Sequence, residues 1–361
     1  MTPARHRRRR ANTLRWVVPV VVVAAAIVAV VHVGGHHTPS TTGSTTSTTH
    51  PAAVPIAPLT GLPDPNGRAL TRPALTVKIE NVPAAMPQQG IDQADVIYEE
   101  IVEGGITRLA AIFNSKDPPI IGPIRSVRKT DRELVWPIGG IFVYSGGAQY
   151  AVNSIETAPV KLIDEDTAGD AMYRDNDGRV APNNLYGIGS RLFNFGGTPT
   201  PPPPLFSYRA PGAAVSGRRV SSFIVGFGSG YTVSYNWDGH TKTWNRFQFQ
   251  APDVAADGTR LSPANVIVQF VHYQGGVGVI RAQATLIGTG PVAIFTDGRE
   301  ITGTWHRGSL SDVTHYRTSD GKAIRLTPGQ TWVELLNYDY PLTVTYVPTS
   351  HPTTTPASQS S

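Results

Sequence analysis

Hydrophobic and polar positions divide the chain into an apolar N-terminal run, a polar stretch and a long folded body. The apolar run, WVVPVVVVAAAIVAVVHV at 16–33, carries no charge except a potential one on His32. About 17–25 apolar residues cross a bilayer as a helix, and arginine-rich flanks stay in the cytoplasm. Six arginines precede this run. The pattern predicts a basic cytoplasmic tail at 1–15 and a transmembrane signal-anchor at 16–34, with the body outside the cell.

A cleaved secretory signal is the alternative to an anchor. The apolar core is long for a signal and no A-x-A site follows it, so an uncleaved, single-pass anchor in the cell membrane is preferred. Residues 35–58 are rich in Thr, Ser and Pro, and such a composition buries too little apolar surface to fold. We therefore expect a tether there, and a similar disordered tail at 348–361.

The body separates into two predicted parts at TPTPPPP, 198–204, because proline lacks the amide donor that helices and strands need. The first part, 59–197, has a mixed pattern. Its expected strands and helices are a strand at 76–80, a hairpin over 94–113, a helix at 126–136, a buried strand at 140–145 and a helix near 148–156. This pattern predicts a mixed α/β N-terminal domain.

The second part, 205–347, is predicted to be mainly antiparallel β. Its segments are rich in β-branched and aromatic residues, as in NVIVQFVHY and LTVTYV. Three Asp-Gly pairs, beginning at Asp238, Asp297 and Asp320, lie between such segments and favour tight hairpin turns. The predicted fold class is therefore α+β, with a sandwich or partly open barrel suiting the second part.

Charge and cysteine content exclude several classes of protein. Without the six arginines that precede the apolar run, 25 basic residues remain beside 26 acidic ones, a net charge of −1. A body without excess positive charge is a poor nucleic-acid binder, so no nucleic-acid partner is expected. The chain has no cysteine, which excludes disulfides, thiolate metal sites and a thiol nucleophile. We predict no cofactor and no metal site.

The first candidate site lies around Gly104-Gly105. If these two residues form the whole turn, Ile101 stands opposite Arg108, and Glu99, Glu103 and Arg108 share one face. Two acids beside one arginine suit a ligand clamp, and Glu99 or Glu103 with a raised pKa suits a general acid or base. A salt-bridged hairpin surface without function is the alternative.

A second candidate lies in IGPIRSVRKTD, 121–131. Ser126 is a predicted N-cap of the helix that follows, with Arg125 and Arg128 at its first turn. Free backbone amides and arginine side chains both favour an anionic ligand group. The alternative is internal pairing of these arginines with Asp131 or with the hairpin acids.

Two loops add candidate ligand-binding residues. Ser145, Gly146 and Gly147 lie between a strand and a helix. A backbone ligand loop is preferred there over a serine nucleophile, because the G-x-S-x-G pattern is absent and no histidine occurs between His50 and His240. Asn183 and Asn184 follow a proline and are candidates for orienting a loop or for hydrogen bonding to a ligand.

Several motifs resemble the YerB-like family of bacterial envelope proteins. They are PLTGLP (58–63), RPALTVKIEN (72–81), PQQGIDQADVIYEEIVEGGITRLAAIF (87–113), GPIRSVR (122–128), NNLY (183–186), GTW (303–305) and LTPGQTWVELL (326–336). The resemblance covers 59–347 and implies an extracytoplasmic, membrane-attached protein with paired N- and C-terminal domains, but no particular activity. Relatives often carry a lipidated cysteine, which is absent here, and commonly a histidine where Asn183 stands, which weakens the case for an enzyme.

These features favour a tethered envelope module that binds an anionic or polar ligand such as cell-wall glycan or peptide. The second hypothesis is a wall-active hydrolase or transferase that uses Glu99 or Glu103 as acid or base. The third is an interaction module whose β-rich part binds an envelope protein. The membrane is the partner expected for residues 16–34.

Overall fold

The computed structural model describes residues 54–176, 178–196, 200–228, 230–275 and 282–348. The predicted cytoplasmic tail and transmembrane segment lie outside the described residues, as do most of the predicted tether and C-terminal tail. The tether ends earlier than predicted, because Ile56 already pairs with Pro63 and Ala57 is buried. In the described part of the chain, no helix is both long and apolar enough to cross a membrane.

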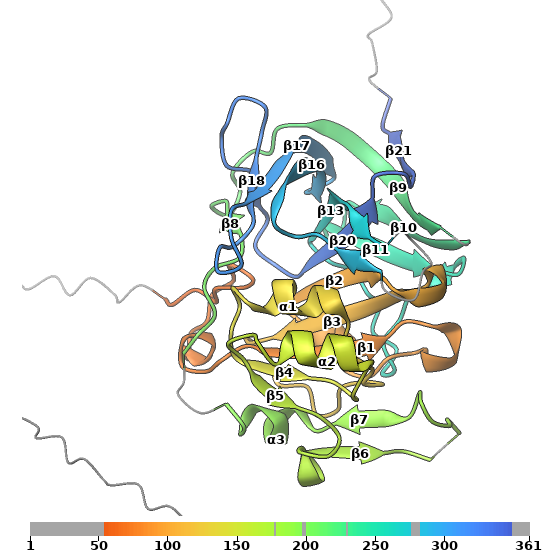
Figure 1. Ribbon diagram of the computed structural model, residues 1–361. Coiled ribbons are helices and arrows are strands. Elements are labelled where there is room, and N and C mark those ends of the chain that lie inside the picture. Colours follow the sequence, from red (N-terminus) through yellow and green to blue (C-terminus); the bar gives the residue numbers. More distant parts are fainter. Residues whose placement is uncertain (1–53, 177, 197–199, 229, 276–281, 349–361) are drawn as a thin grey trace, which may run out of the picture. The chain divides into compact units, whose positions relative to one another are not determined.

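One sheet of 15 strands runs through the described body (Figure 1). Its strands, in spatial order, are β12 (Ala251–Pro252), β11 (Thr243–Gln248), β10 (Tyr231–Asp238), β9 (Arg218–Gly228), β17 (Arg299–Arg307), β16 (Gly288–Thr296), β13 (Asn265–Val271), β20 (Thr331–Asn337), β2 (Val96–Ile101), β3 (Thr107–Phe113), β1 (Leu75–Glu80), β4 (Ile141–Val143) and β5 (Lys161–Ile163). Two further strands branch from this path, β18 (His315–Arg317) beside β17 and β21 (Leu342–Tyr346) beside β9.

Three small sheets accompany the large one. They pair β14 (Tyr273–Gln274) with β15 (Gln283–Ala284), β8 (Ser207–Tyr208) with β19 (Arg325–Leu326), and β6 (Met172–Arg174) with β7 (Leu185–Gly187). The α-helices of the described residues are short: α1 (Lys129–Val135), α2 (Gln149–Ile155) and α3 (Gly189–Phe193). The described residues are therefore mostly β sheet with few helices, and a mixed α/β N-terminal domain is not supported.

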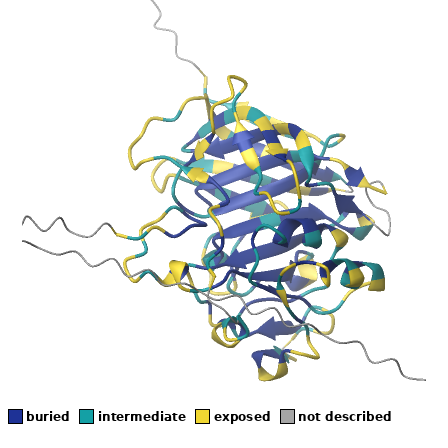
Figure 2. Cartoon of the chain, turned by 60° about the vertical axis from the view of Figure 1, so that its left-hand side comes forward, coloured by how far each residue is buried: buried dark blue, intermediate teal, exposed yellow. Residues whose placement is uncertain are grey.

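Strand β1 is buried along its whole length, because the sheet is covered on both faces there. One face carries Val96 and Ile112 and packs with apolar residues of α1 and α2. The other face carries Val77 and Leu109 and packs with residues around β7. Figure 2 shows the central strands as buried, whereas the exposed positions lie on loops, on outer helix surfaces and on the outer strands. Charged side chains of β1 are consequently buried.

Strand β20 joins the two predicted parts into a continuous sheet. It lies between β13 and β2 and runs parallel to both of them. The segment TWVELL reads as an almost unbroken apolar run, which is typical of a strand buried on both faces. Residues 200–204 contain no helix or strand, but the sheet nevertheless continues from one part into the other.

The β-rich second part is confirmed. All of its expected strands are present, and most of their pairings are antiparallel. Asp297 and Gly298 form the two-residue turn between β16 and β17, with positive φ angles of 50° and 69°. This is the conformation for which Asp-Gly is favoured in hairpins.

Candidate functional site

The hairpin of β2 and β3 closes with a longer turn than predicted. The N–H of Val102 donates to the carbonyl of Ile106 at 2.8 Å, which leaves three residues in the turn. Arg108 consequently stands opposite Glu100, so the predicted register is wrong by one residue. A shift of one residue moves a side chain to the other face of the sheet. Glu99 therefore does not share a face with Arg108.

On the α1 side of the sheet, Glu80 forms ion pairs with two arginines. The buried Arg108 donates from Nη2 to Glu80 Oε2 at 3.3 Å and from Nη1 to the carbonyl of Ser126 at 3.3 Å. Nε of Arg125 donates to the same carboxylate. Burial alone would raise the pKa of Glu80, but the charges of Arg108 and Arg125 outweigh it and lower the pKa. Arg108 is thus a buried residue that holds Glu80 and the backbone of Ser126 in place, and it is not positioned to contact a ligand.

A second cluster of buried charges, centred on Lys78, lies beside the cluster at Glu80. Nζ of Lys78 is 2.7 Å from Glu100 Oε1 and 2.8 Å from Asp131 Oδ1. Asp131 also accepts a 2.6 Å hydrogen bond from the N–H of Arg128, so Arg128 is the N-cap of α1 and the predicted N-cap at Ser126 is wrong. Burial raises the pKa of Asp131 to about 6. Sequence reasoning missed Lys78 and Glu80, whose alternation in TVKIE is typical of a half-exposed strand.

The two predicted clusters meet in space above these buried charges. Nε of Arg128 donates to Glu103 Oε2 at 2.7 Å, which ties the hairpin turn to the start of α1. The N–H of Ser145 donates to the carbonyl of Arg125 at 3.0 Å, and the N–H of Val127 donates to the carbonyl of Gly146 at 3.0 Å. The loop at 145–147 therefore lies alongside residues 125–128.

Two glycines permit this close approach. Gly146 has a φ of 88°, which disfavours other residues, and a Cβ on Gly147 would lie only 2.8 Å from Cγ1 of Val127. We call the resulting patch the arginine–serine surface. It comprises Arg125, Ser126, Arg128, Ser145 and Gly146.

Hydrogen-bonding capacity remains unused on the arginine–serine surface. The Arg125 side chain is 22% exposed, and only its Nε binds another group. Among the described residues, its two terminal nitrogens and the hydroxyls of Ser126 and Ser145 have no hydrogen-bond partner. Arg128, in contrast, is committed to Glu103 and to backbone carbonyls. Arg125 is therefore the side chain best placed to hold an anionic group.

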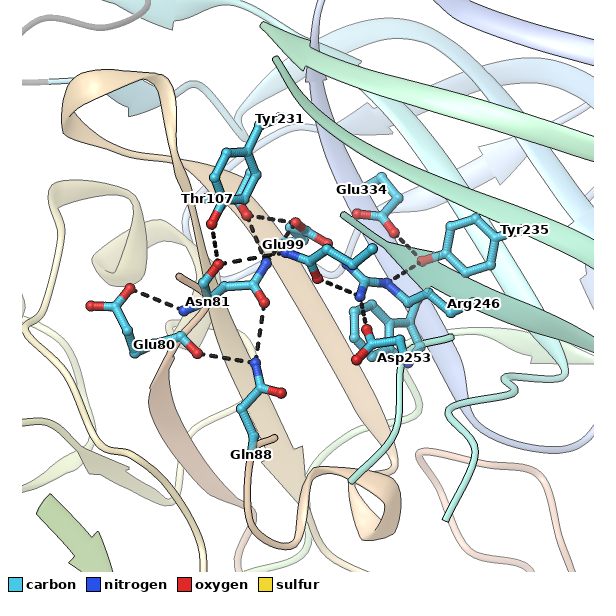
Figure 3. A network of polar contacts seen from close by, with 12 residues as sticks. Glu80, Asn81, Gln88, Glu99, Thr107, Tyr231, Tyr235, Arg246, Asp253 and Glu334 are labelled. Atoms are coloured by element: carbon cyan, nitrogen blue, oxygen red, sulfur yellow. Dashed lines mark hydrogen bonds and ion pairs between the residues drawn. The ribbon is translucent and has the colours of Figure 1, made fainter. Parts of the chain in front are cut away.

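Glu99 belongs to a different network on the opposite face (Figure 3). Its carboxylate is fully buried and accepts hydrogen bonds from Asn81 Nδ2 at 3.0 Å and Thr107 Oγ1 at 2.6 Å. Nη2 of the buried Arg246 donates to Glu99 Oε2 at 2.6 Å. Because no surface of Glu99 is open to solvent, its carboxylate does not meet a ligand in this conformation.

Arg246 is the centre of this buried network. It donates to Asp253, to Tyr235 at 3.1 Å and to Gln248 at 2.7 Å, and its guanidinium lies 4.3 Å from the ring centre of Trp332. Burial alone would lower the pKa of Arg246, but the neighbouring acids raise it well above its usual value. The network therefore holds β2 to the strands and loops of the second part.

Glu334 stands directly opposite Glu99 on β20 and accepts a hydrogen bond from Tyr235. Burial and, after it, the charge of Glu99 raise the pKa of Glu334 well above its usual range. The protonated form of Glu334 is therefore favoured. The pair resembles a shared-proton dyad chemically, but both carboxyl groups are buried, which makes it a structural feature here.

Asn183 and Asn184 lie just before β7, in a separate cluster. Asn184 accepts a hydrogen bond from Arg174 Nη1 at 3.0 Å and donates to Asn176 at 3.3 Å. Arg174 in turn pairs with Glu165 at 2.5 Å. Among the described residues, no hydrogen bond or ion pair joins either asparagine to the arginine–serine surface. Their predicted role in ligand binding stays a prediction.

Comparison with known proteins supports the resemblance. Residues 59–196 match the family model described as "Protein of unknown function (DUF3048) N-terminal domain", and residues 223–333 match that of its C-terminal domain. A Bacillus subtilis (strain 168) protein named "Putative lipoprotein YerB" is 34% identical over 130 residues, which is 36% of this chain and 39% of the relative. The match thus spans about two fifths of that relative's length.

The fold has a counterpart among solved structures. The crystal structure of YerB protein from Bacillus subtilis aligns with a TM-score of 0.70 and 24% sequence identity. The alignment covers 80% of this chain and 99% of that one. The two proteins therefore share the fold across both matched domains.

Proposed function

This chain belongs to the YerB-like DUF3048 family, and from that premise we propose that it is an extracytoplasmic envelope protein that binds an anionic ligand. The name of the Bacillus subtilis relative supports attachment to the membrane. Because this chain has no cysteine to carry a lipid, the apolar run at 16–33 would provide the attachment as a single-pass anchor. The body would then lie outside the cell, within reach of the wall.

The unused donors of Arg125 carry the ligand-binding proposal. Glu80 fixes Nε, so the guanidinium is held in place while its terminal nitrogens remain available. A pre-positioned guanidinium binds a carboxylate through two parallel hydrogen bonds with little further loss of side-chain freedom. The hydroxyls of Ser126 and Ser145 would complete the contacts. The proposed ligand is a carboxylate-bearing component of the cell wall, such as its peptide.

The arrangement favours binding over turnover. Glu99 is buried and ion-paired with Arg246, which leaves it unsuited to exchange a proton with a substrate. Glu103 is 30% exposed, but its carboxylate is engaged by Arg128. A general acid needs a positioned proton near the reacting atom, and neither predicted glutamate supplies one in this arrangement.

The test uses the full chain in detergent micelles, incubated with purified cell-wall sacculi. We expect the protein to pellet with the sacculi and Arg125→Ala to bind about 10- to 150-fold more weakly, as expected for the loss of about 1.5–3 kcal/mol from a charge-assisted contact. Arg191→Ala is the matched control, because Arg191 is an exposed arginine on α3 paired only with Asp170.

Three results separate the alternatives. Equal binding by Arg125→Ala and Arg191→Ala would contradict the proposed site. Release of wall fragments that is lost in Glu103→Gln would instead support an enzyme. Absence of both pelleting and release would contradict both wall functions and leave the protein-interaction hypothesis.

A further inference from the structure

A second basic surface lies in the C-terminal part, where β9, β17 and β21 meet. It is a hollow of about 600 Å³ at the start of β9. Arg218, Arg219 and Arg299 line it together with Tyr346. The predicted ligand-binding residues lie elsewhere, so this hollow is separate from the arginine–serine surface.

Two arginines of the hollow are cross-strand neighbours on adjacent strands. Arg219 on β9 is the direct partner of Arg299 on β17. Like charges in directly opposite positions destabilise a strand pair. Among the described residues, no carboxylate forms an ion pair with Arg218, Arg219 or Arg299, and the one hydrogen bond of an Arg299 terminal nitrogen goes to the carbonyl of Gly217 at 2.8 Å. The described residues therefore do not neutralise the repulsion between Arg219 and Arg299.

The nearest carboxylate, that of Glu300, forms a hydrogen bond with a tyrosine instead of an ion pair with an arginine. Glu300 stands opposite Arg218, but it is only 8% exposed and accepts a 2.7 Å hydrogen bond from the hydroxyl of Tyr346. The Arg218 guanidinium lies 3.3 Å from the centre of the Tyr346 ring, and stacking of this kind leaves the N–H groups at the edge of the guanidinium free to donate. Arg219 and Arg299, which have no ion-pair partner among the described residues, therefore leave two positive charges at the hollow.

We propose that this hollow binds a phosphate group. A phosphate carries up to two negative charges and several acceptor oxygens, which match the charge surplus and the forked donors of Arg218, Arg219 and Arg299. A single carboxylate would leave one positive charge uncompensated between Arg219 and Arg299. The phosphate can be a free ion or the phosphomonoester headgroup of phosphatidic acid, because both carry up to two negative charges and present at least three unesterified oxygens to the arginines.

Calorimetric titration of the full chain in a neutral detergent tests this site. The two probes are inorganic phosphate and glycerol 3-phosphate, which is the deacylated headgroup of phosphatidic acid. We expect wild type to bind at least one probe and Arg219→Gln to bind it at least tenfold more weakly, with Arg191→Gln unchanged. The probe that binds more tightly identifies the source. No binding of either probe by wild type, or equal affinity in Arg219→Gln, would overturn the proposal.

Thermal unfolding provides a second readout that does not depend on affinity. Removing one of two facing charges relieves their repulsion, so Arg219→Gln should unfold at a higher temperature than wild type in phosphate-free buffer. Added phosphate should raise the unfolding temperature of wild type and leave that of Arg219→Gln unchanged. A lower unfolding temperature for Arg219→Gln without phosphate would contradict the repulsion argument. Arg125→Ala should keep the full phosphate response, which separates this site from the proposed wall-binding function.

Discussion

Replacement of Arg246 tests whether the buried network holds the two family domains together. Arg246 is fully buried and binds Glu99 from the N-terminal domain as well as Asp253 and Tyr235 from its own side. Arg246→Met keeps much of the side-chain volume and the contact with Trp332. It removes the positive charge, so two buried carboxylates lose their partner.

The expected cost follows from that desolvation. Removing one member of a buried ion pair costs about 3–5 kcal/mol, because the remaining charge stays buried without compensation. Two carboxylates depend on Arg246, so we expect the upper end of that range for Arg246→Met. Glu99→Gln in the same chain removes one of the stranded charges, and the double variant should therefore recover at least about 1.5 kcal/mol of the loss.

Urea unfolding of the full chain, followed by tryptophan fluorescence, measures these free energies. Trp244 and Trp332 are buried close to the network and report on its loss. The reasoning is refuted if Arg246→Met lowers the free energy of unfolding by less than about 1 kcal/mol, or if the effects of Arg246→Met and Glu99→Gln are additive. Either result would mean that the acids are solvated or paired in another way.

Further predictions concern the residues around α1. The pKa of Asp131 is raised from 3.8 to about 6, so the native state holds a proton that the unfolded chain releases. The stability that this proton contributes is complete below about pH 4 and is lost as the pH rises through 6. The free energy of unfolding should fall by up to about 3 kcal/mol over that range, at about 1.36 kcal/mol per pKa unit. Asp131→Asn should flatten that fall in urea titrations at pH 4 and pH 7, and an unchanged fall would assign it to another group. Gly147→Ala should destabilise by about 1–3 kcal/mol through its clash with Val127 and weaken sacculus binding, whereas Gly239→Ala, with no neighbour closer than 3.7 Å, should do neither. Glu103→Gln should change the free energy of unfolding by less than about 1 kcal/mol because its ion pair is partly exposed; a larger loss would show that the pair is structural.

Local sequence patterns predicted most strands. The expected strand at 76–80 is observed as β1, and the helix expected near 148–156 is observed as α2. The hairpin is also present, but its register depends on whether the two glycines alone, or Glu103 together with them, turn the chain. Both have positive φ, and Glu103 joins them in the turn. Glycine accepts this conformation in turns of either length, so the sequence did not determine which face Arg108 occupies.

Long-range pairing was not accessible to the same reasoning. Strand β20 reaches β2 from more than 200 residues away, and no local pattern indicates that neighbour. Its position buries Glu99 beside Glu334 and brings Arg246 to the first domain. Lys78 and Glu80 were missed for a related reason, since alternating charges in a strand predict a solvated face unless a second layer covers it.

Hydrogen exchange of the full chain, with and without soluble wall fragments, tests the central claim most directly. The fragments are prepared free of phosphate-containing polymers, so the hollow at Arg219 is not engaged. The account predicts protection of backbone amides at 125–128 and 145–147 on binding, and its loss in Arg125→Ala. Protection confined to other segments, or protection at these segments that persists in Arg125→Ala, would contradict it.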